Sequence, residues 1–218
     1  MNRQYILSCE STVDLPYSYV SGRDIPVLFY SYTVDGVSYT DDMLRDPEAL
    51  PRFYRFLSEG KLPNTSQINE FAYEEFFEDL VQRGDVLHIA FGSGMSNSVA
   101  NAQKAAQLVR ERHPERKLLV IDSLCSSSGY GMLVDYAADL RDGGASMEEV
   151  AQWVMENRNR VFSSRQIYES VWNDAAYGAE NTVAVHIRHL REKLEIDPAN
   201  PRVLKVVWGH GYKLSDEG

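Results

Sequence analysis

The stretch DVLHIAFGSGMSNSVANAQKAAQLVRERHPERKLLVIDS, residues 85–123, decides the fold class of this chain. It opens and closes with short apolar runs, DVLHIAFG (85–92) and KLLVIDS (117–123), which are typical of buried strands. Between them lies a helical segment, VANAQKAAQLVRERH (99–113), that Pro114 terminates. Two buried strands joined by a helix make a βαβ unit, so the sequence predicts a parallel sheet.

The segments before this stretch continue the pattern. Residues 4–9 are expected to form a strand, and residues 25–34 form another, rich in β-branched and aromatic side chains. The pair Asp35-Gly36 then turns the chain into VSYT (37–40), which predicts a hairpin. Residues 61–67 are expected to be a loop.

Further segments carry helix start and stop signals. Ser146 and Glu149 have the spacing of a capping box at the start of one of them. With helices on both faces of short apolar strands, the expected fold class is α/β, a mostly parallel sheet with flanking helices. The three helical segments are residues 46–60, 68–84 and 146–160. Pro51 is expected to split the first, and Phe71, Phe76 and Leu80 are expected on the buried side of the second.

The composition is that of an ordinary soluble globular protein. Hydrophobic residues make up 44% and charged residues 25% of the 218 residues. The two cysteines, Cys9 and Cys125, are far apart and lack CxxC spacing, which favours a reducing compartment. The N-terminal apolar run is too short for a signal peptide, and no run approaches the length of a membrane span. We therefore expect a cytoplasmic protein without a membrane span.

Charge divides the chain into two parts. Residues 1–150 hold 13 basic and 23 acidic residues, whereas residues 151–218 hold 9 of each. The acidic part should repel a phosphate backbone, and the last segment need not. This asymmetry predicts two modules with different partners, over residues 1–157 and 158–218.

The loops after the predicted strands are rich in hydroxyl groups. In open α/β sheets, ligands bind at the carboxyl ends of the strands. Hydroxyls and loop N–H groups suit a carboxylate or phosphate, so an anion site is one interpretation. Ser, Thr and Gly are also ordinary loop and helix-cap residues, and spacing alone favours that structural interpretation. The hydroxyl residues are Ser11, Thr12, Thr65, Ser66, Ser93, Ser96 and Ser98.

No catalytic constellation is visible in the sequence. GSGMS (92–96) departs from the G-x-S-x-G pattern of serine hydrolases, and no His, Cys and Asp cluster has metal-ligand spacing. His88 lies inside a predicted buried strand, where a hydrogen-bonded core residue is more common than a catalytic base. His113 sits at a helix end before Pro114, where it complements the helix dipole. We therefore expect no enzymatic activity and no cofactor.

Four loop motifs follow one another in the first 157 residues. They are ESTVDLP (10–16), NTSQ (64–67), GSGMSNSVANAQ (92–103) and VIDSLCSSSGYGMLV (120–134). In this order they resemble the loops of the DegV family of bacterial fatty-acid-binding proteins. Residues 4–157 are similar to the N-terminal domain of that family, with Glu10 where the opening motif usually has Asp.

This resemblance implies a ligand and a partner. It implies that Thr65 and Ser96 hydrogen-bond a fatty-acid carboxylate, with Ser93 as a further candidate. It also implies that the acyl chain is presented to a partner fatty acid kinase. The family has a second domain that closes the acyl tunnel, and nothing after residue 160 resembles it. Because each CH₂ group left in water costs about 0.8 kcal/mol, such a half-site is expected to bind fatty acids weakly or not at all.

After residue 160 the strand–helix alternation stops. Two predicted helices, 161–172 and 182–194, precede a hairpin around Gly209–Gly211. This order resembles the winged helix-turn-helix DNA-binding domain of OmpR/PhoB-type response regulators. The matching stretches are VFSSRQIYESVW (161–172), NTVAVHIRHLREKLEIDPANPRVLKVV (181–207) and WGHGYKL (208–214).

The helix over 182–194 has one apolar stripe, formed by Val183, Ile187, Leu190 and Leu194. Its outer face carries Thr, His and Arg, which suits entry into a major groove, although a solvated basic helix is the plainer interpretation. The resemblance implies that residues 181–195 are the recognition helix and that the hairpin is the wing. The implied base or groove contacts are Val185, Arg188 and His189, and the implied phosphate contacts are Trp172, Thr182, His186 and Arg191.

The junction fits both resemblances. Residues 146–160 match the last helix of the DegV-like domain and the first helix of the winged-helix domain, so one helix is expected to serve both. The leading hypothesis is a lipid-responsive transcription regulator that binds double-stranded DNA. Winged-helix proteins bind as dimers on repeated half-sites, so a homodimer belongs to this hypothesis. The alternatives are a fatty-acid carrier with a non-functional C-terminal segment and a chimera with neither activity intact.

Overall fold

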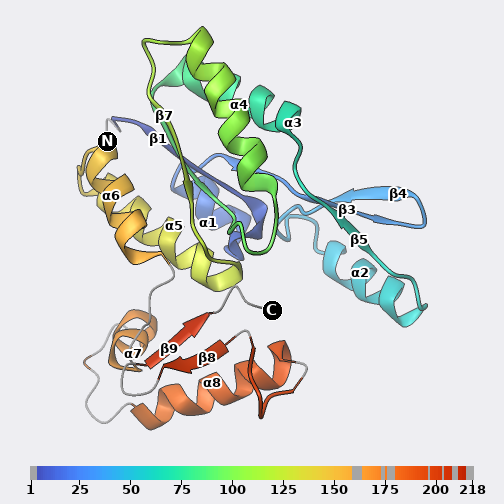
Figure 1. Ribbon diagram of the computed structural model, residues 1–218. Coiled ribbons are helices and arrows are strands. Elements are labelled where there is room, and N and C mark those ends of the chain that lie inside the picture. Colours follow the sequence, from blue (N-terminus) through green and yellow to red (C-terminus); the bar gives the residue numbers. More distant parts are fainter. Residues whose placement is uncertain are drawn as a thin grey trace. The chain divides into compact units, whose positions relative to one another are not determined.

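The computed structural model divides the chain into two compact units, residues 1–158 and residues 159–218 (Figure 1). The helix expected over 146–160 is α6 (Met147–Asn157), which belongs to the first unit. That this helix also serves the second unit stays a prediction. The structure describes residues 4–158, 164–172, 175, 180–195, 197–202, 204–207 and 211–214.

The first unit is built on a parallel sheet with the strand order β2-β1-β6-β7. Leu87 on the third of these strands lies opposite Leu7 on one side and Leu119 on the other. This confirms the expected α/β fold class with a mostly parallel sheet. The strands are β1 (Ile6–Glu10), β2 (Val27–Leu28), β6 (Val86–Ala90) and β7 (Leu118–Asp122).

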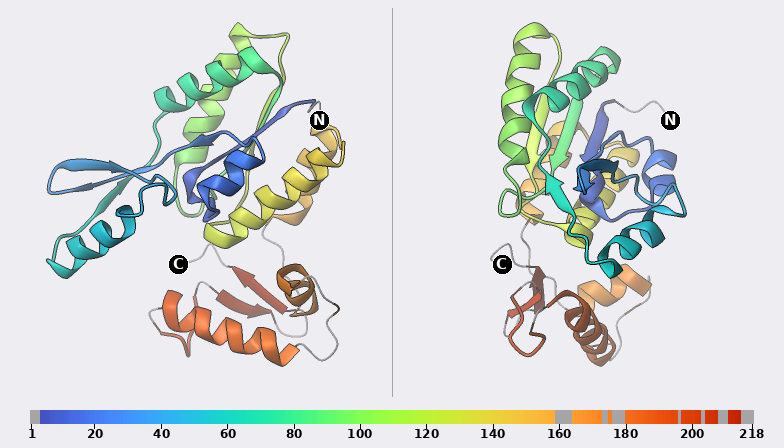
Figure 2. Two further views of the ribbon diagram at one scale, coloured as in Figure 1. Left: turned by 180° about the vertical axis from the view of Figure 1, so that it is seen from behind. Right: turned by 90° about the vertical axis from the view of Figure 1, so that its right-hand side faces the viewer.

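Helices cover both faces of this sheet (Figures 1 and 2). One layer holds α3 (Glu70–Arg83) and α4 (Ser98–Arg112), whose apolar side chains pack with Val86 and Leu118. The other layer holds α5 (Ser127–Asp142) and α6. All residues of β6 are buried, because a strand covered on both faces has no solvated side.

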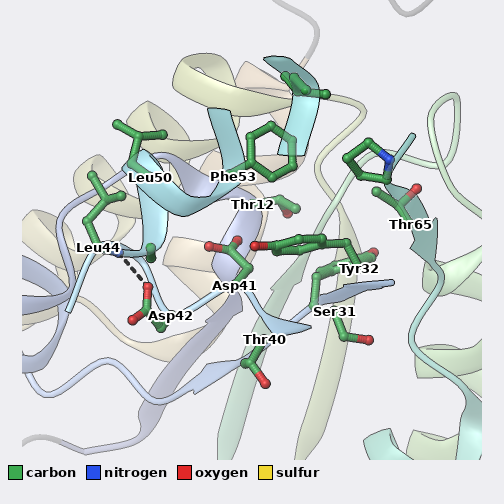
Figure 3. A pocket seen from close by; sticks show the side chains of 14 residues that line it. Thr12, Ser31, Tyr32, Thr40, Asp41, Asp42, Leu44, Leu50, Phe53 and Thr65 are labelled. Atoms are coloured by element: carbon green, nitrogen blue, oxygen red, sulfur yellow. Dashed lines mark hydrogen bonds between the residues drawn. The ribbon is translucent and has the colours of Figure 1, made fainter. Parts of the chain in front are cut away.

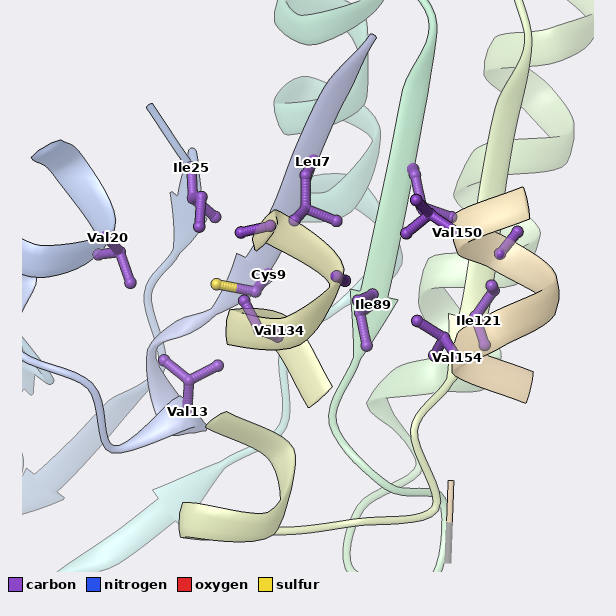
Figure 4. Packing of buried hydrophobic residues seen from close by; sticks show 14 of the residues in the cluster. Leu7, Cys9, Val13, Val20, Ile25, Ile89, Ile121, Val134, Val150 and Val154 are labelled. Carbon is purple, nitrogen blue, oxygen red and sulfur yellow. The ribbon is translucent and has the colours of Figure 1, made fainter. Parts of the chain in front are cut away.

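The core beneath α5 and α6 is made of interlocking aliphatic side chains (Figure 4). Val134 from α5 and Val150 from α6 pack in the same cluster as Leu7 and Ile89 of the sheet. A short helix, α1 (Tyr17–Gly22), adds Val20 to it. The expected capping box is confirmed: the Ser146 side chain accepts the N–H of Glu149, and the Glu149 carboxylate accepts the N–H of Ser146.

The buried face of α3 differs in part from expectation. Tyr73, Phe77 and Leu80 form its buried stripe, at helical spacing. Phe71 was expected on this face, and that prediction is wrong, since its side chain is 65% exposed. Two residues before Tyr73, Phe71 projects from the other side of the helix.

A smaller antiparallel sheet with the order β4-β3-β5 stands beside the parallel one. The expected hairpin is confirmed as β3 (Ser31–Val34) and β4 (Val37–Thr40), with positive φ angles of 50° at Asp35 and 79° at Gly36. Residues 25–34 form two strands rather than one, because β2 joins the parallel sheet and β3 the antiparallel sheet. The loop expected over 61–67 contains a strand, β5 (Asn64–Ser66), which pairs with β3.

Helix α2 (Ala49–Ser58) lies against this smaller sheet, where the Phe53 ring meets that of Tyr32 edge-on at 5.3 Å. Pro51 does not split the helix, contrary to expectation. It occupies the first turn, where backbone N–H groups have no partner within the helix and a proline is tolerated.

The second unit contains two helices and a hairpin: α7 (Ser164–Trp172), α8 (Glu180–Leu194), and β8 (Leu204–Val207) paired antiparallel with β9 (Gly211–Leu214). Val183 and Ile187 pack against Leu204, which confirms that part of the expected stripe. Leu190 is 45% exposed, so its predicted burial is wrong. At that turn Arg191 faces the hairpin instead, and the Leu194 side chain lies outside the described residues.

Candidate functional site

The carboxyl ends of β1, β6 and β7 bring three loops together. After β6 the chain turns at Gly92, whose N–H donates to the Cys125 carbonyl at 2.9 Å. A Cβ atom at Gly92 would lie 2.8 Å from both the nitrogen and the oxygen of Cys125, so this approach requires glycine. The N–H of Ser93 donates to Asp122 Oδ1 at 3.1 Å. These contacts fix the loop that carries the predicted serines.

A buried carboxylate anchors the same loop. Glu10, at the end of β1, is fully buried and accepts the N–H of Phe91 at 2.5 Å and the Tyr73 hydroxyl at 2.5 Å. His88 Nε2 lies 3.2 Å from Glu10, and its Nδ1 lies 3.0 Å from the Ser8 hydroxyl. The sequence-based assignment of His88 to the core, with its hydrogen bonds satisfied, is confirmed.

Burial and the charge of Glu10 act on the surrounding phenols. Burial first, and then the nearby Glu10 carboxylate, raise the pKa of Tyr73. The same causes raise the pKa of Tyr130, whose hydroxyl lies 2.6 Å from the Ile89 carbonyl and 2.9 Å from the Glu10 N–H. Both phenols therefore stay protonated at neutral pH. The cluster links α3 and α5 to the ends of β1 and β6.

Hydrogen bonds join the segment that carries Thr65 to the one that carries Ser96. The N–H of Ile68 donates to the Ser98 hydroxyl at 3.2 Å, and the Asn101 side chain donates to the Ile68 carbonyl at 2.8 Å. The Ser98 hydroxyl lies 2.8 Å from that of Ser96. The end of β5 is thus held against the first turn of α4.

A cavity of about 480 Å³ opens between the smaller sheet, α2 and the turn after β1 (Figure 3). Its walls are mostly apolar, and hydroxyl groups supply most of the polar side chains. The carboxylates of Asp41 and Asp42 also reach it, and they accept the backbone N–H groups of Met43 and Leu44. The lining residues include Thr12, Tyr30, Ser31, Tyr32, Thr40, Leu44, Leu50, Phe53, Leu57, Pro63 and Thr65.

The predicted carboxylate residues occupy different parts of this region. Thr65 lines the cavity from β5, directly across from Tyr32 in the strand pairing. Ser96 is half-buried and bonded to Ser98, and Ser93 is exposed on the same loop. Neither serine lines the cavity. Sequence reasoning missed Tyr30 and Tyr32, although their two-residue spacing in the predicted strand placed them on one face.

The predicted DNA contacts on α8 are mostly exposed. Thr182, Val185, His186, Arg188 and His189 are all solvent-exposed, as expected for an outer face. The Arg188 side chain pairs with Glu192 at 3.1 Å.

Two other predicted contacts differ from this pattern. Arg191 is half-buried, and its guanidinium donates to the Leu204 carbonyl at 2.7 and 2.9 Å, so it braces the hairpin. The Trp172 side chain and the predicted wing residues 208–210 lie outside the described residues.

No group of three or more His, Cys, Asp or Glu side chains in the described ranges is arranged to hold a metal ion. Within the same part of the chain, no helix combines the length and apolarity needed to cross a bilayer.

Comparison with known proteins identifies the family. The model of the family described as "Uncharacterised protein, DegV family" matches residues 7–194, which runs beyond residue 157, where we expected the DegV-like part to end. The DegV domain-containing protein CPE0026 of Clostridium perfringens is 34% identical over 161 residues, covering 73% of this chain and 55% of that protein.

A solved structure and a regulator are also similar. The chain superposes on a fatty-acid-binding DegV family protein from Thermus thermophilus with a TM-score of 0.63 and 26% identity, covering 73% of this chain and 55% of that one. The transcriptional regulatory protein YvrH of Bacillus subtilis is 49% identical over 70 residues, which is 32% of this chain and 30% of that protein. The chain spans about half the length of its DegV relatives. By the family match and the shared fold, this chain belongs to the DegV family.

Proposed function

We propose that the first unit binds a fatty acid, with the carboxylate held by Thr65, Ser96 and Ser93. One observation carries this proposal: an apolar cavity of about 480 Å³ has Thr65 on its wall, and the strand that bears Thr65 is tied to the Ser96 turn. Hydroxyl and backbone N–H donors hydrogen-bond strongly to a carboxylate. Burial of an acyl chain against the leucines and Phe53 of the cavity is favourable by about 0.8 kcal/mol of binding free energy per CH₂ group.

The reported fatty-acid binding of the Thermus thermophilus relative supports this ligand class. Because this chain spans about half of that relative, we propose that it holds the head group and only part of the chain. The protein then acts as a cytoplasmic carrier rather than an enzyme. It presents the carboxylate to a partner, and a fatty acid kinase is the partner that we propose.

Mass spectrometry of lipid extracted from the purified protein tests this function. The expected result is co-purified fatty acid, retained by the wild type and lost from the Thr65→Ala/Ser96→Ala variant. A Thr33→Ala/Ser38→Ala variant is the matched control, because these two residues pair across the hairpin and neither lines the cavity. Equal retention in both double variants would place the carboxylate site elsewhere.

A second candidate function is DNA binding by the second unit. The exposed row of Thr182, His186, Arg188 and His189 on α8 favours it, and so does the 49% identity with YvrH over 70 residues. We propose a winged helix-turn-helix that binds duplex DNA as a homodimer and makes the protein a lipid-responsive regulator. A gel shift whose affinity falls steeply with salt supports this candidate. If the gel shows no DNA shift while fatty acid is still bound, the protein is a carrier with a non-functional C-terminal segment. If neither DNA nor fatty acid is bound, the protein is a chimera with neither activity intact.

A further inference from the structure

One face of α8 is turned toward the β8–β9 hairpin and carries residues at a spacing of four. Val183 and Ile187 pack against the Leu204 side chain. Arg191 and Glu195 follow on the same face, because residues four apart lie one above the other on a helix. Glu195 lies one residue past the end of α8, and its N–H donates to the Arg191 carbonyl at 2.9 Å, which continues the helical geometry. The face is thus apolar over its first turns and charged beyond them.

Arg191 and Glu195 bind both backbone polar groups of Leu204, the residue that opens β8. Arg191 donates from Nε and Nη2 to the Leu204 carbonyl at 2.9 and 2.7 Å. Glu195 Oε1 accepts the Leu204 N–H at 2.7 Å, and Oε2 accepts the Arg202 N–H at 2.8 Å. Hydrogen bonds with one charged partner are about twice as strong as neutral ones. Arg191 and Glu195 therefore form a hairpin clamp, which ties the first strand of the hairpin to α8.

A two-stranded hairpin needs support of this kind. In an antiparallel pair, alternate residues direct their N–H and C=O groups away from the partner strand, and β8 pairs only with β9 among the described strands. Such a hairpin is at best marginally stable in water unless it packs against another element. The hairpin clamp gives the backbone of Leu204 charged partners on the helix side. It fixes the place of β8 along α8 by direct bonds, in addition to the packing of Leu204.

Neither charge of the hairpin clamp suits a contact with DNA. The Arg191 side chain is half-buried, and its guanidinium is directed at the Leu204 carbonyl, whereas Arg188 on the same helix is exposed. Glu195 is a carboxylate, which a phosphate backbone repels. A carboxylate at the end of the proposed recognition helix therefore has another role than touching the polyanion.

We propose that Arg191 and Glu195 are positioning residues for DNA binding, which hold the β8–β9 hairpin at the place on α8 where both elements meet one duplex. This inference rests on the second candidate function, DNA binding by the second unit, and it replaces the phosphate contact predicted for Arg191. It differs in sign from a simple charge effect. Loss of the Glu195 charge alone should strengthen binding to a polyanion, whereas loss of positioning should weaken it.

Fluorescence anisotropy of the full chain with a labelled duplex of about 30 base pairs, long enough for two half-sites, tests the inference at several salt concentrations. Glu195→Ala and Arg191→Ala are each expected to weaken binding about tenfold. The slope of log affinity against log salt should stay at the wild-type value in Arg191→Ala, whereas a lost phosphate contact would reduce its magnitude by about 0.9. Glu192→Ala is the matched control. It removes the same charge from an exposed position on α8, beside Arg188 rather than the hairpin, and should bind at least as tightly as the wild type.

Amide hydrogen exchange without DNA separates local positioning from general unfolding. In Glu195→Ala, the amides of Arg202 and Leu204 should exchange faster, while those in the middle of α8 keep their wild-type protection. Wild-type or tighter binding by Glu195→Ala, or a smaller salt slope in Arg191→Ala, would overturn this inference and leave DNA binding standing. Faster exchange throughout α8 would overturn it as well, since unfolding would then explain the weaker binding. A wild type that binds no duplex at any salt concentration would overturn DNA binding and this inference together.

Discussion

The Tyr73 hydroxyl on α3 donates a 2.5 Å hydrogen bond to the carboxylate of Glu10 at the end of β1. Both side chains are fully buried, and the same carboxylate accepts the N–H of Phe91, which begins the loop bearing Ser93 and Ser96. One buried carboxyl group thus connects a surface helix, a central strand and the proposed ligand loop. Its replacement should therefore affect stability and loop geometry together.

We expect Glu10→Ala to lower the free energy of unfolding by about 3 kcal/mol, because it leaves several buried donors unpaired. Urea denaturation of the purified variant measures this loss. Glu75→Ala is the control, since Glu75 is exposed on the same helix as Tyr73. If the two variants were equally stable, Glu10 would not be the anchor described above.

Gly92→Ala should destabilise the first unit by about 2 kcal/mol, a typical cost of overpacking. The new Cβ would lie 2.8 Å from the Cys125 backbone, which cannot move aside as a flexible side chain could. Gly22→Ala, at a site with nothing within 4 Å, should cost less than 1 kcal/mol. Thermal or urea unfolding of the two variants measures the difference. Equal losses of stability in Gly92→Ala and Gly22→Ala would contradict the close approach of Gly92 to Cys125.

Acid sensitivity should depend on Glu78. Burial is the largest single effect and raises its pKa, but the hydrogen bonds and charges of Arg112 and His113 together outweigh it and hold the pKa below its ordinary value of 4.5. A carboxylate with a lowered folded-state pKa stabilises the protein above its unfolded pKa, and this contribution is lost as the pH falls through the folded pKa. The stability advantage of the wild type over Glu78→Gln should thus shrink below about pH 4.5.

Urea midpoints measured from pH 7 to pH 3 provide that comparison. Glu75→Gln, on the exposed side of the same helix, should track the wild type throughout. A Glu78→Gln deficit that stays constant across this range would show that charge at Glu78 does not contribute.

If the second unit binds DNA, Arg188→Ala should weaken binding about tenfold, within the range expected for one lost arginine–base contact. The matched control is Arg83→Ala, because each arginine pairs with a glutamate or aspartate four residues away, at 3.1 and 3.8 Å respectively. Gel shifts at two salt concentrations measure both variants. Equal affinities would remove Arg188 from the proposed interface.

Local sequence determined much of the fold. The apolar runs around His88 and Val120 predicted buried parallel strands, the Asp35-Gly36 pair predicted the hairpin, and Ser146 with Glu149 predicted the start of α6. These features succeed because their causes lie within a few residues: continuous apolar runs, positive φ angles and a capping hydrogen bond. The same patterns also identified the loops in which Thr65, Ser93 and Ser96 lie.

Only the tertiary structure decided which polar groups are paired. Glu10 hydrogen-bonds Tyr73 and Tyr130, 63 and 120 residues away, and nothing in the local sequence marks it as a buried polar residue. The division of residues 25–34 between two sheets, and the addition of β5, likewise depended on which distant strand offered free hydrogen bonds. The periodic elements follow from local sequence, whereas burial and long-range strand pairing created the cavity.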